Sequence, residues 1–263
     1  MDKGQLLDGK VCLVTGTNRG IGRRIAEIFA NAGGFVYAGA RQKNRMQDWT
    51  DTININTAGK ISPIYFDVTD SASIKQAVMQ IKKEQGKLDV LVNSAGVVHN
   101  GALGMVPMDK VREMFEVNVF GLLELSQLVA TRLMIKQKSG SIVNISSITG
   151  VEGSRGQAAY SASKGAVIAI TKSMAQELAP YQIRVNSVAP GMVETERLHV
   201  EIREEYRNNM PPIGMGRLGS TGDIADACLY FASDMASYTT GQVMVVGGGY
   251  DTQSRALYNI EYH

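Results

Sequence analysis

Short apolar runs recur along the chain, each the length of a buried β-strand, and segments with apolar residues at helical spacing separate most of them. Parallel strands need long crossover connections, and helices usually supply them. The alternation therefore predicts an α/β fold, a doubly wound parallel sheet of about seven strands with helices on both faces. We expect a single domain over residues 1–263, with strands at 11–15, 35–38, 61–66, 90–93, 141–145, 184–188 and 242–246.

The longest helical pattern, residues 158–179, carries a narrow apolar stripe with one residue in every four. Small residues begin the stripe and allow another helix to approach closely. Packing against the sheet of the same subunit and contact with a second subunit both fit this pattern. The stripe consists of Ala158, Ala162, Ala166, Ile170, Met174 and Leu178.

Composition excludes several classes of function. The 27 basic and 25 acidic residues are interspersed, so nothing indicates nucleic acid or an anionic membrane as the main partner. No apolar run approaches the ~18 residues of a membrane helix, and the first residues lack a signal core. Cys12 and Cys228 have no second cysteine at metal spacing, which predicts buried thiols in a reducing compartment, the cytoplasm. His99, His199 and His263 form no ligand set, so we expect no metal site.

A glycine-rich turn joins the first predicted strand to a helical pattern. Gly16 permits a tight turn, Gly20 allows the backbone to approach a pyrophosphate, and Gly22 allows close packing of helix and strand. The helix N-terminus adds free N–H groups and a partial positive charge. An ordinary glycine-rich turn is the alternative, but the order strand, turn, helix favours dinucleotide binding.

Two arginines indicate which dinucleotide. An NAD site usually carries an acidic residue about 20 positions after the glycines, whereas an arginine there accommodates a 2′-phosphate. Here the position is occupied by Arg41, and no acidic residue follows until Asp48. Arg19 precedes Gly20 directly, so a second guanidinium is available to the same phosphate. The sequence therefore predicts NADP(H).

Tyr160 and Lys164 are four residues apart on a predicted helix, so their side chains share one face. A neighbouring ammonium stabilises a phenolate and lowers the pKa of a tyrosine. Tyr160 is therefore a candidate general acid in reduction and general base in oxidation. Such a pair is also common on surface helices, so the prediction depends on the other motifs.

Taken together, these motifs resemble the classical short-chain dehydrogenase/reductase family over nearly the whole chain. The glycines have that family's spacing, G-x-x-x-G-x-G, and the later motifs follow in its order. The resemblance implies a Rossmann-type fold and hydride transfer with a nicotinamide cofactor. The motifs are residues 15–22, 67–68, 93–96, Asn118, Ser147, Tyr160 with Lys164, residues 190–195 and residues 241–249.

The resemblance also implies roles for single residues. Asn118 would anchor a proton-relaying water, Ser147 would bind the substrate carbonyl, and Lys164 would lower the pKa of Tyr160 and hold the nicotinamide ribose. These four form the expected catalytic tetrad, and Ser147, Tyr160 and His99 are the expected substrate contacts. The expected cofactor residues are Gly16, Asn18, Arg19, Gly20, Ile21, Gly22, Arg41, Asp67, Val68, Asn93, Ala95, Gly96, Tyr160, Lys164, Pro190, Gly191, Val193 and Thr195.

The chain departs from the family pattern at two positions. Ser94 replaces a commoner asparagine, and Val246 stands where relatives usually carry Asp or Asn before two glycines. Residues 196–215 resemble the family's substrate lid, and residues 251–263 form a tail of unassigned role.

The segment from Arg217 to Gln242 most resembles 3-oxoacyl-acyl-carrier-protein reductases, which favours carbonyl reduction by NADPH. Arg132, Lys136 and Lys138 are candidates for contact with an acidic carrier. A keto-sugar, polyol or other secondary-alcohol dehydrogenase is the alternative on the same scaffold. A regulator that senses NADP(H) without catalysis is a more remote alternative. The family further implies a homotetramer or dimer.

Overall fold

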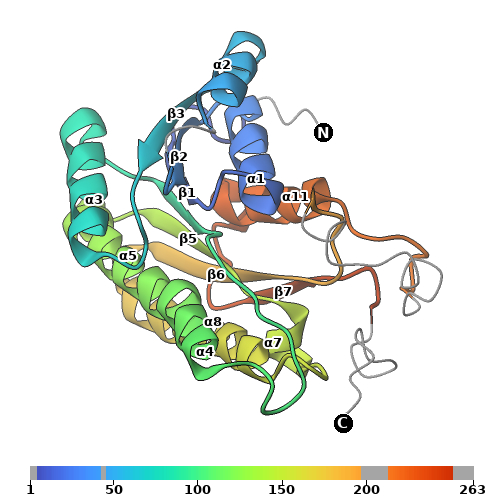
Figure 1. The fold of residues 1–263 in the computed structure, drawn as a ribbon. Helices are drawn as coiled ribbons and strands as arrows, with labels where there is room; N and C mark the ends of the chain where they lie inside the picture. The colour runs from blue at the N-terminus through green and yellow to red at the C-terminus, as the bar shows by residue number, and fades with distance from the viewer. Residues whose placement is uncertain (1–4, 43–45, 197–212, 251–263) are drawn as a thin grey trace.

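The computed structural model describes residues 5–42, 46–196 and 213–250. Its centre is a seven-stranded sheet in the order β3-β2-β1-β4-β5-β6-β7, and every neighbouring pair is parallel (Figure 1). The predicted doubly wound α/β fold is therefore confirmed. The strands are β1 Val11–Thr15, β2 Phe35–Ala40, β3 Lys60–Tyr65, β4 Val90–Asn93, β5 Gly140–Ile145, β6 Ile183–Pro190 and β7 Val243–Val246.

Two strands, β2 and β6, extend further at their carboxyl ends than the sequence predicts. The last residues of β2, Gly39 and Ala40, pair with Ile64 and Tyr65 of β3. At the end of β6, Pro190 pairs with Val246 of β7. Glycine, alanine and proline have low strand propensity, so here the pairing with a neighbouring strand imposes the extended conformation.

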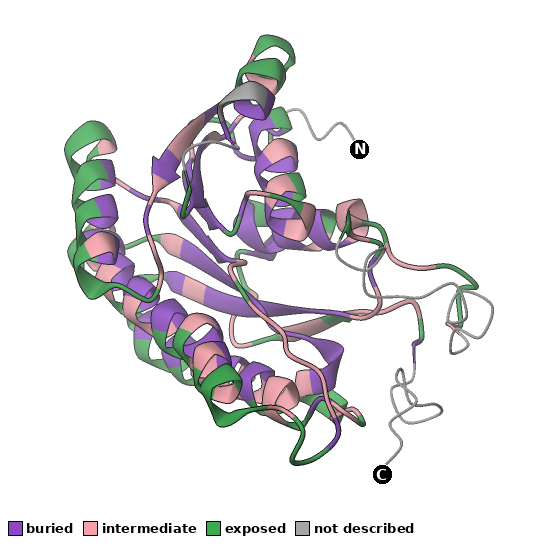
Figure 2. Cartoon of the chain, viewed as in Figure 1, coloured by how far each residue is buried: buried purple, intermediate pink, exposed green. Residues whose placement is uncertain are grey.

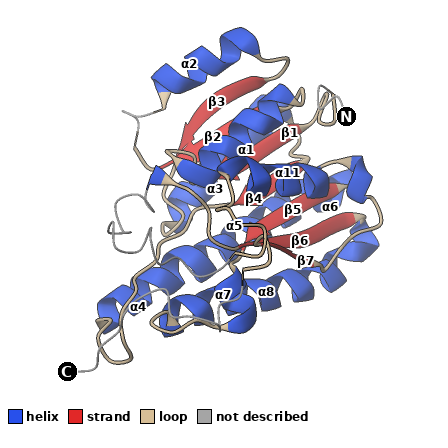
Figure 3. Ribbon diagram, turned by 90° about the vertical axis from the view of Figure 1, so that its right-hand side faces the viewer, coloured by secondary structure: helices blue, strands red, loops and turns tan. Residues whose placement is uncertain are grey.

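Helices cover both faces of the sheet (Figures 1 and 3). Alternate strand residues point to opposite faces: Cys12 and Val14 of β1 join one core cluster, and Val11 and Leu13 join the other. The first cluster includes α1 Gly20–Asn31, α2 Gln47–Asn56 and α11 Thr221–Ala232. The second includes α3 Ser71–Gln85, α5 Gly121–Val129 and α8 Ala158–Leu178. Burial on both faces explains why β1 and β4 are continuous apolar runs, whereas the edge strands β3 and β7 are only partly buried (Figure 2).

Two π-helical turns interrupt the long helical segment between β4 and β5. The segment runs through α4 Met108–Phe115, the π-turn Glu116–Phe120, α5, the π-turn Ala130–Met134 and α6 Ile135–Gln137. Shorter elements are α7 Ile148–Glu152 and the 3₁₀ turns Ala179–Tyr181 and Asp234–Ala236. Single π-turns inside helices are frequent at functional sites, and the first one here contains Asn118.

The stripe on α8 divides into two halves. Met174 and Leu178 are buried in the second core cluster, which confirms packing within the subunit for the C-terminal half. Ala158 and Ala162 are exposed, so this chain alone does not cover the N-terminal half. Among the described residues, no helix is long and apolar enough to cross a membrane.

Candidate active site

The functional motifs converge where the strands end. The glycine turn follows β1, residues 94–96 follow β4, Ser147 follows β5, and Gly191 follows β6. Because all of the strands are parallel, these four segments lie at the same edge of the sheet.

The glycine turn has the geometry of an anion cradle. Gly16 and Gly20 have φ angles of +73° and +60°, which non-glycine residues rarely adopt. A Cβ on Gly16 would lie 2.8 Å from the Cα of Ala95, and a Cβ on Gly22 would overlap the Gly16 carbonyl. Helix α1 begins after Arg19 with no side-chain cap and no acidic residue in its first turn, so its N–H groups can receive an anion.

One buried polar atom in this turn has no partner. Oδ1 of Asn18 is buried without a hydrogen bond to any described residue. A native protein rarely leaves such an atom unsatisfied, which is consistent with a ligand that supplies the missing donor. The residues of the turn therefore fit a dinucleotide.

Two threonines that the sequence analysis missed fix this turn in place. Thr15 Oγ1 accepts hydrogen bonds from the backbone N–H groups of Ser94 and Ala95, both at 3.0 Å. Thr17 Oγ1 donates to the Gly39 carbonyl at 3.1 Å. Both side chains are buried, so the turn is held to the segment that follows β4 and to β2 itself. In the sequence, these roles are indicated by a threonine on each side of the turn glycine, Gly16.

We expect Thr15→Val to destabilise the fold and weaken cofactor binding together. Valine preserves the shape but leaves two partly buried N–H groups without an acceptor, which costs about 1–3 kcal/mol. Urea unfolding and a dinucleotide titration would measure the two effects. Thr131→Val is the matched control, because Thr131 is exposed and bonds only within its own helix, to Gln127 and Leu128. A Thr15→Val protein as stable as this control would contradict the assignment.

Arg19 and Arg41 are both exposed at the same edge, and Arg41 directly follows the last residue of β2. Asp67 follows β3 after one intervening residue, and its Oδ1 accepts from the N–H and the hydroxyl of Thr69 at 2.9 and 2.8 Å. The carbonyl of Val68 approaches Gly121 so closely that a Cβ there would overlap it. The structure thus brings the predicted adenosine-side residues to one edge.

Asn93 is committed to the interior. Its Nδ2 donates to Ser126 Oγ and to Asn144 Oδ1, both at 2.8 Å, and Asn144 Nδ2 donates in turn to Thr171 Oγ1 at 2.9 Å. This buried chain of hydrogen bonds joins α5, β4, β5 and α8 beneath the site. Both side-chain N–H groups of Asn93 are therefore unavailable to a ligand.

Lys164 is a buried cation beside Tyr160. Its side chain is 5% exposed, its Nζ donates to the Ile145 carbonyl at 2.8 Å, and Nζ lies 5.9 Å from the centre of the Tyr160 ring. Desolvation lowers the pKa of Lys164 from 10.5 to about 8. No carboxylate among the described residues lies within 4.0 Å of it, so its charge is free to act on Tyr160 and on a bound ligand.

Asn118 lies next to this lysine. Its Oδ1 accepts from Val97 N at 2.8 Å, and its Nδ2 donates to Val97 O and Ser163 Oγ at 2.9 and 3.1 Å. A Cβ on Gly96 would lie 3.2 Å from Asn118 Oδ1 and 3.5 Å from Lys164 Nζ, so the three residues are in mutual proximity. Both amide hydrogens are used, which leaves the backbone of Asn118 for the predicted water.

The structure separates the two serines after β5. Ser146 donates to the Val188 carbonyl at 3.2 Å and accepts from Ser187 at 2.7 Å, so its hydroxyl serves the sheet. Ser147 caps α7: its Oγ accepts from Thr149 N at 3.2 Å and lies 3.1 Å from Thr149 Oγ1. The hydroxyl of Ser147 is thus not committed to the sheet, and its contact with substrate stays a prediction.

His99 has a partner on α4. Its Nε2 lies 3.3 Å from Glu113 Oε2, and both side chains are partly exposed. The geometry accordingly gives His99 a contact within the protein, and its predicted contact with substrate stays a prediction.

The loop after β6 contacts both neighbours of the site. Gly191 N donates to the Val246 carbonyl at 2.9 Å, and a Cβ on Gly191 would lie 2.7 Å from the Cα of Gly247. Val246 contributes through its backbone here, so the departure at that position leaves this contact intact. Val193 pairs with Gly219, and the methyl of Thr195 approaches Gly20. Most of the predicted lid, residues 197–212, and the tail 251–263 lie outside the described residues.

The proposed carrier patch lies at the wrong edge. Arg132, Lys136 and Lys138 belong to the end of the helical segment that leads into the first residue of β5, Gly140. The catalytic candidates gather at the opposite end of that strand, after Ile145. The structure therefore does not bring these three residues to the site.

The chain is similar to one family model, two curated relatives and one solved structure, as follows. A family model described as short chain dehydrogenase matches residues 10–206. The chain is 40% identical over 246 residues to 3-oxoacyl-[acyl-carrier-protein] reductase FabG of Thermotoga maritima, covering 92% of this chain and 98% of that protein. It is 38% identical over 242 residues to the same reductase of Escherichia coli, covering 92% and 97%. A crystal structure of a short-chain type dehydrogenase/reductase from Mycobacterium marinum superposes with a TM-score of 0.87 and 36% identity, covering 95% of this chain and 98% of that one.

Proposed function

The chain belongs to the short-chain dehydrogenase family, and from this premise we propose that it reduces a 3-oxoacyl thioester with NADPH. Membership makes it an oxidoreductase that acts on CH–OH or C=O groups. The thioester is supported by the names of the curated relatives, 35–40% identical over 92% of this chain. Carbonyl reduction is the working direction that we propose.

The observation that carries the proposal is the buried Lys164 ammonium beside Tyr160, with Asn118 next to it and Ser147 at the same edge. When bound, the nicotinamide supplies a hydride to the carbonyl carbon. Tyr160 then donates its phenolic proton to the carbonyl oxygen, which gives a secondary alcohol. Ser147 Oγ donates a hydrogen bond to the same oxygen and stabilises the negative charge that develops there.

Lys164 has two tasks in this mechanism. Its positive charge lowers the pKa of Tyr160, so that the phenol can lose and regain a proton near neutral pH. Its ammonium also holds the cofactor's ribose hydroxyls. A water bound at the backbone of Asn118 returns the proton from solvent to Lys164 and Tyr160. Asn118 cannot bind that water through its amide hydrogens, because Val97 and Ser163 occupy them.

We expect Arg41→Ala to discriminate between the two cofactors. Removal of a guanidinium paired with the 2′-phosphate costs about 1.5–3 kcal/mol, roughly 10–100-fold in KM for NADPH, and leaves KM for NADH unchanged. Initial rates with each cofactor would measure this. Lys83→Ala, which removes an exposed charge at the far end of α3, is the control. Equal effects on NADPH and NADH would overturn the proposed role of Arg41.

A substrate panel tests the function itself. NADPH oxidation at ~340 nm reports hydride leaving the cofactor directly. The panel would contain 3-oxoacyl thioesters, keto-sugars, polyols and small diketones, each with NADPH and NADH. Turnover of a thioester with NADPH supports the proposal, and turnover of a keto-sugar or polyol alone moves the protein to another substrate class. Tight NADPH binding without any turnover would favour a sensing regulator.

We also propose that the enzyme assembles as a homotetramer or a dimer. The exposed N-terminal half of the α8 stripe supports a contact with a second copy, as do the side chains of Met108 and Phe120, which are 59% and 52% exposed. Sedimentation velocity would measure the assembly state.

We propose the cytoplasm as the compartment of this protein, because both cysteines are buried free thiols, and burial raises the pKa of both.

A further inference from the structure

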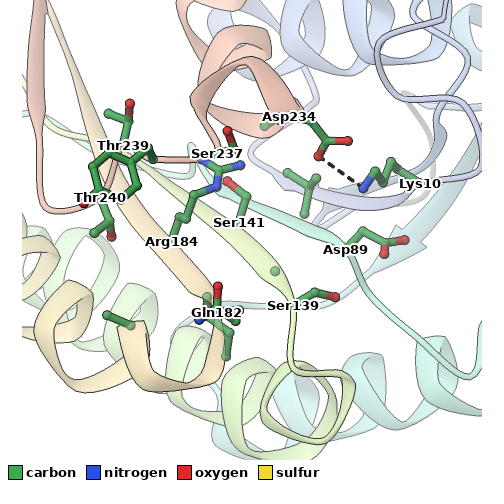
Figure 4. Close-up of a pocket in the computed structure, with 16 residues that line it drawn as sticks. Lys10, Asp89, Ser139, Ser141, Gln182, Arg184, Asp234, Ser237, Thr239 and Thr240 are labelled. Carbon is green, nitrogen blue, oxygen red and sulfur yellow. Dashed lines mark hydrogen bonds and ion pairs between the residues drawn. The ribbon is translucent and has the colours of Figure 1, made fainter.

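A cavity lies at the edge of the sheet opposite the candidate active site. It has a volume of about 520 Å³, which is within the range of pockets for small metabolites. Its walls include Val90, Gly140 and Ile183, the first residues of β4, β5 and β6, together with the segment 234–240 (Figure 4). We call it the amino-edge pocket. No step of the proposed reaction uses it.

Arg184 forms one wall of this pocket and carries unused hydrogen-bond donors. Its Nη1 donates to the Phe231 carbonyl at 2.7 Å, and its Nη2 donates to the Ser233 carbonyl at 3.1 Å. A guanidinium has five N–H groups, so three are still available. No carboxylate in the described part of the chain lies within 4.0 Å of Arg184, and partial burial lowers its pKa. The cation is thus fixed by neutral carbonyls, and Asp234, the carboxylate that acts on it at longer range, forms no ion pair with it.

The lining of the pocket carries two cations, Lys10 and Arg184, and two carboxylates, Asp89 and Asp234. Lys10 Nζ lies 3.5 Å from Asp234 Oδ1, and the Asp234 side chain is 86% exposed, so that pair is loose. Asp89 accepts from Val11 N at 2.7 Å and lies 2.9 Å from Lys87 Nζ. Both carboxylates already have a lysine partner, Lys10 for Asp234 and Lys87, outside the lining, for Asp89, whereas Arg184 has no ion-pair partner among the described residues. The unpaired Arg184 therefore favours an anionic occupant.

Hydroxyl groups cover much of the remaining wall. Figure 4 shows Ser141 and Ser237 beside Arg184, with Thr239 and Thr240 close by and Ser139 across the cavity. Thr240 Oγ1 accepts from Val185 N at 3.1 Å, which leaves its own proton for a ligand. Such a wall matches a molecule that has hydroxyl groups of its own.

We propose that the amino-edge pocket binds a small oxyanion with hydroxyl groups, a sugar phosphate or a sugar acid. The oxyanion pairs with the free N–H groups of Arg184, since a guanidinium presents two parallel donors to a phosphate or a carboxylate. Lys10 supplies a second positive charge, and the serine and threonine hydroxyls bind the polyol. The pocket is independent of the dinucleotide site.

Calorimetric titration of the full chain tests this proposal. The probes are ribose 5-phosphate, gluconate and neutral ribose, each added in the presence of saturating NADP+ so that the glycine turn is occupied. Ser237→Glu places a carboxylate on an exposed position at the pocket. We expect it to weaken binding of the anionic probes at least about tenfold through like-charge repulsion. Ser173→Glu, which adds the same charge on the exposed side of α8, leaves the affinity unchanged.

Each outcome decides the proposal. Binding of either anion, with loss in the Ser237→Glu variant only, supports it, and the anion that binds identifies the oxyanion as phosphate or carboxylate. Ribose binding as tightly as ribose 5-phosphate would overturn the role of the anion. Binding abolished by Arg41→Ala and unaffected by Ser237→Glu would place the anion at the glycine turn instead. Absence of heat from both anions at millimolar concentration would also overturn the proposal.

Discussion

Tyr160→Phe reduces kcat for carbonyl reduction by at least about 10³-fold, while the affinity for NADPH changes less than about twofold. Phenylalanine keeps the ring and removes the proton that reaches the carbonyl oxygen, and positioned general acids typically contribute 10²–10⁴-fold. Ser147 and the hydride donor remain, so a small residual rate persists. Stopped-flow measurement of NADPH oxidation and a fluorescence titration of NADPH would give the two numbers.

Tyr181→Phe is the matched control for this variant. Tyr181 is 41% exposed and lies after the end of α8, in the 3₁₀ turn that precedes β6. We expect it to retain full activity. Reduction at a tenth of the wild-type rate or better in the Tyr160→Phe protein would exclude Tyr160 as the proton donor. A sensing regulator would show a ligand response that survives the substitution.

Lys164→Met abolishes turnover and makes the protein more stable. Burial depresses the pKa of Lys164 from 10.5 to about 8, which corresponds to about 3 kcal/mol of unfavourable free energy for the charged form at neutral pH. Methionine has a similar length and no charge to desolvate. It leaves the Ile145 carbonyl without its donor, which costs about 1 kcal/mol. We therefore expect a net gain of about 1–2 kcal/mol at pH 7.

The pH dependence provides an independent measurement on the wild-type protein. Between about pH 8 and pH 10.5 the unfolded chain binds a proton at this lysine that the folded chain has lost. The contribution of Lys164 to the free energy of unfolding therefore rises with pH across this window, and the Lys164→Met protein lacks this rise. Urea unfolding without cofactor, at several pH values, would measure it. We also expect the rate of reduction by the wild type to fall above about pH 8, because Lys164 then loses its proton and with it the charge that assists Tyr160.

Lys172→Met, on the exposed side of the same helix, is the control for Lys164→Met. It changes neither activity nor stability beyond about 0.5 kcal/mol. A Lys164→Met protein less stable than wild type at pH 7 would show that the charged lysine stabilises the fold. The prediction that the buried charge of Lys164 lowers the stability of the protein would then be wrong.

The fold could be predicted from the sequence because its strands are buried on both faces. Such strands are continuous apolar runs, and β1 and β4 begin and end where the pattern places them. Local composition could not predict the last residues of β2, because Gly39 and Ala40 are extended only through their pairing with β3. It also could not predict the π-turn around Asn118, since the local pattern is that of an ordinary helix.

Hydrogen bonds between residues far apart in the sequence were the part of the site that could not be predicted from the sequence. The partners of Asn93 lie 33 and 51 residues away, and the two N–H groups bound by Thr15 lie 79 and 80 residues away. Motif spacing identifies residues that share one turn or one helix face, such as Tyr160 and Lys164. It carries no information about which side chains meet across the sheet, and that is why the roles of Thr15, Thr17 and Asn93 required the structure.

The pairing of β1 with β4 has a consequence for how the chain folds during synthesis. Cys12 pairs with Val90, so one edge of β1 has no partner until a further 78 residues have been made. Contacts this distant in sequence slow folding, because the entropy of closing the loop is lost before the contact forms. From the completion of β3 to that of β4, the unpaired N–H and C=O groups along β1 form the open edge of a three-stranded fragment, β3-β2-β1, to which other chains can pair. The nascent protein will therefore depend on chaperones most strongly between the synthesis of β3 and that of β4.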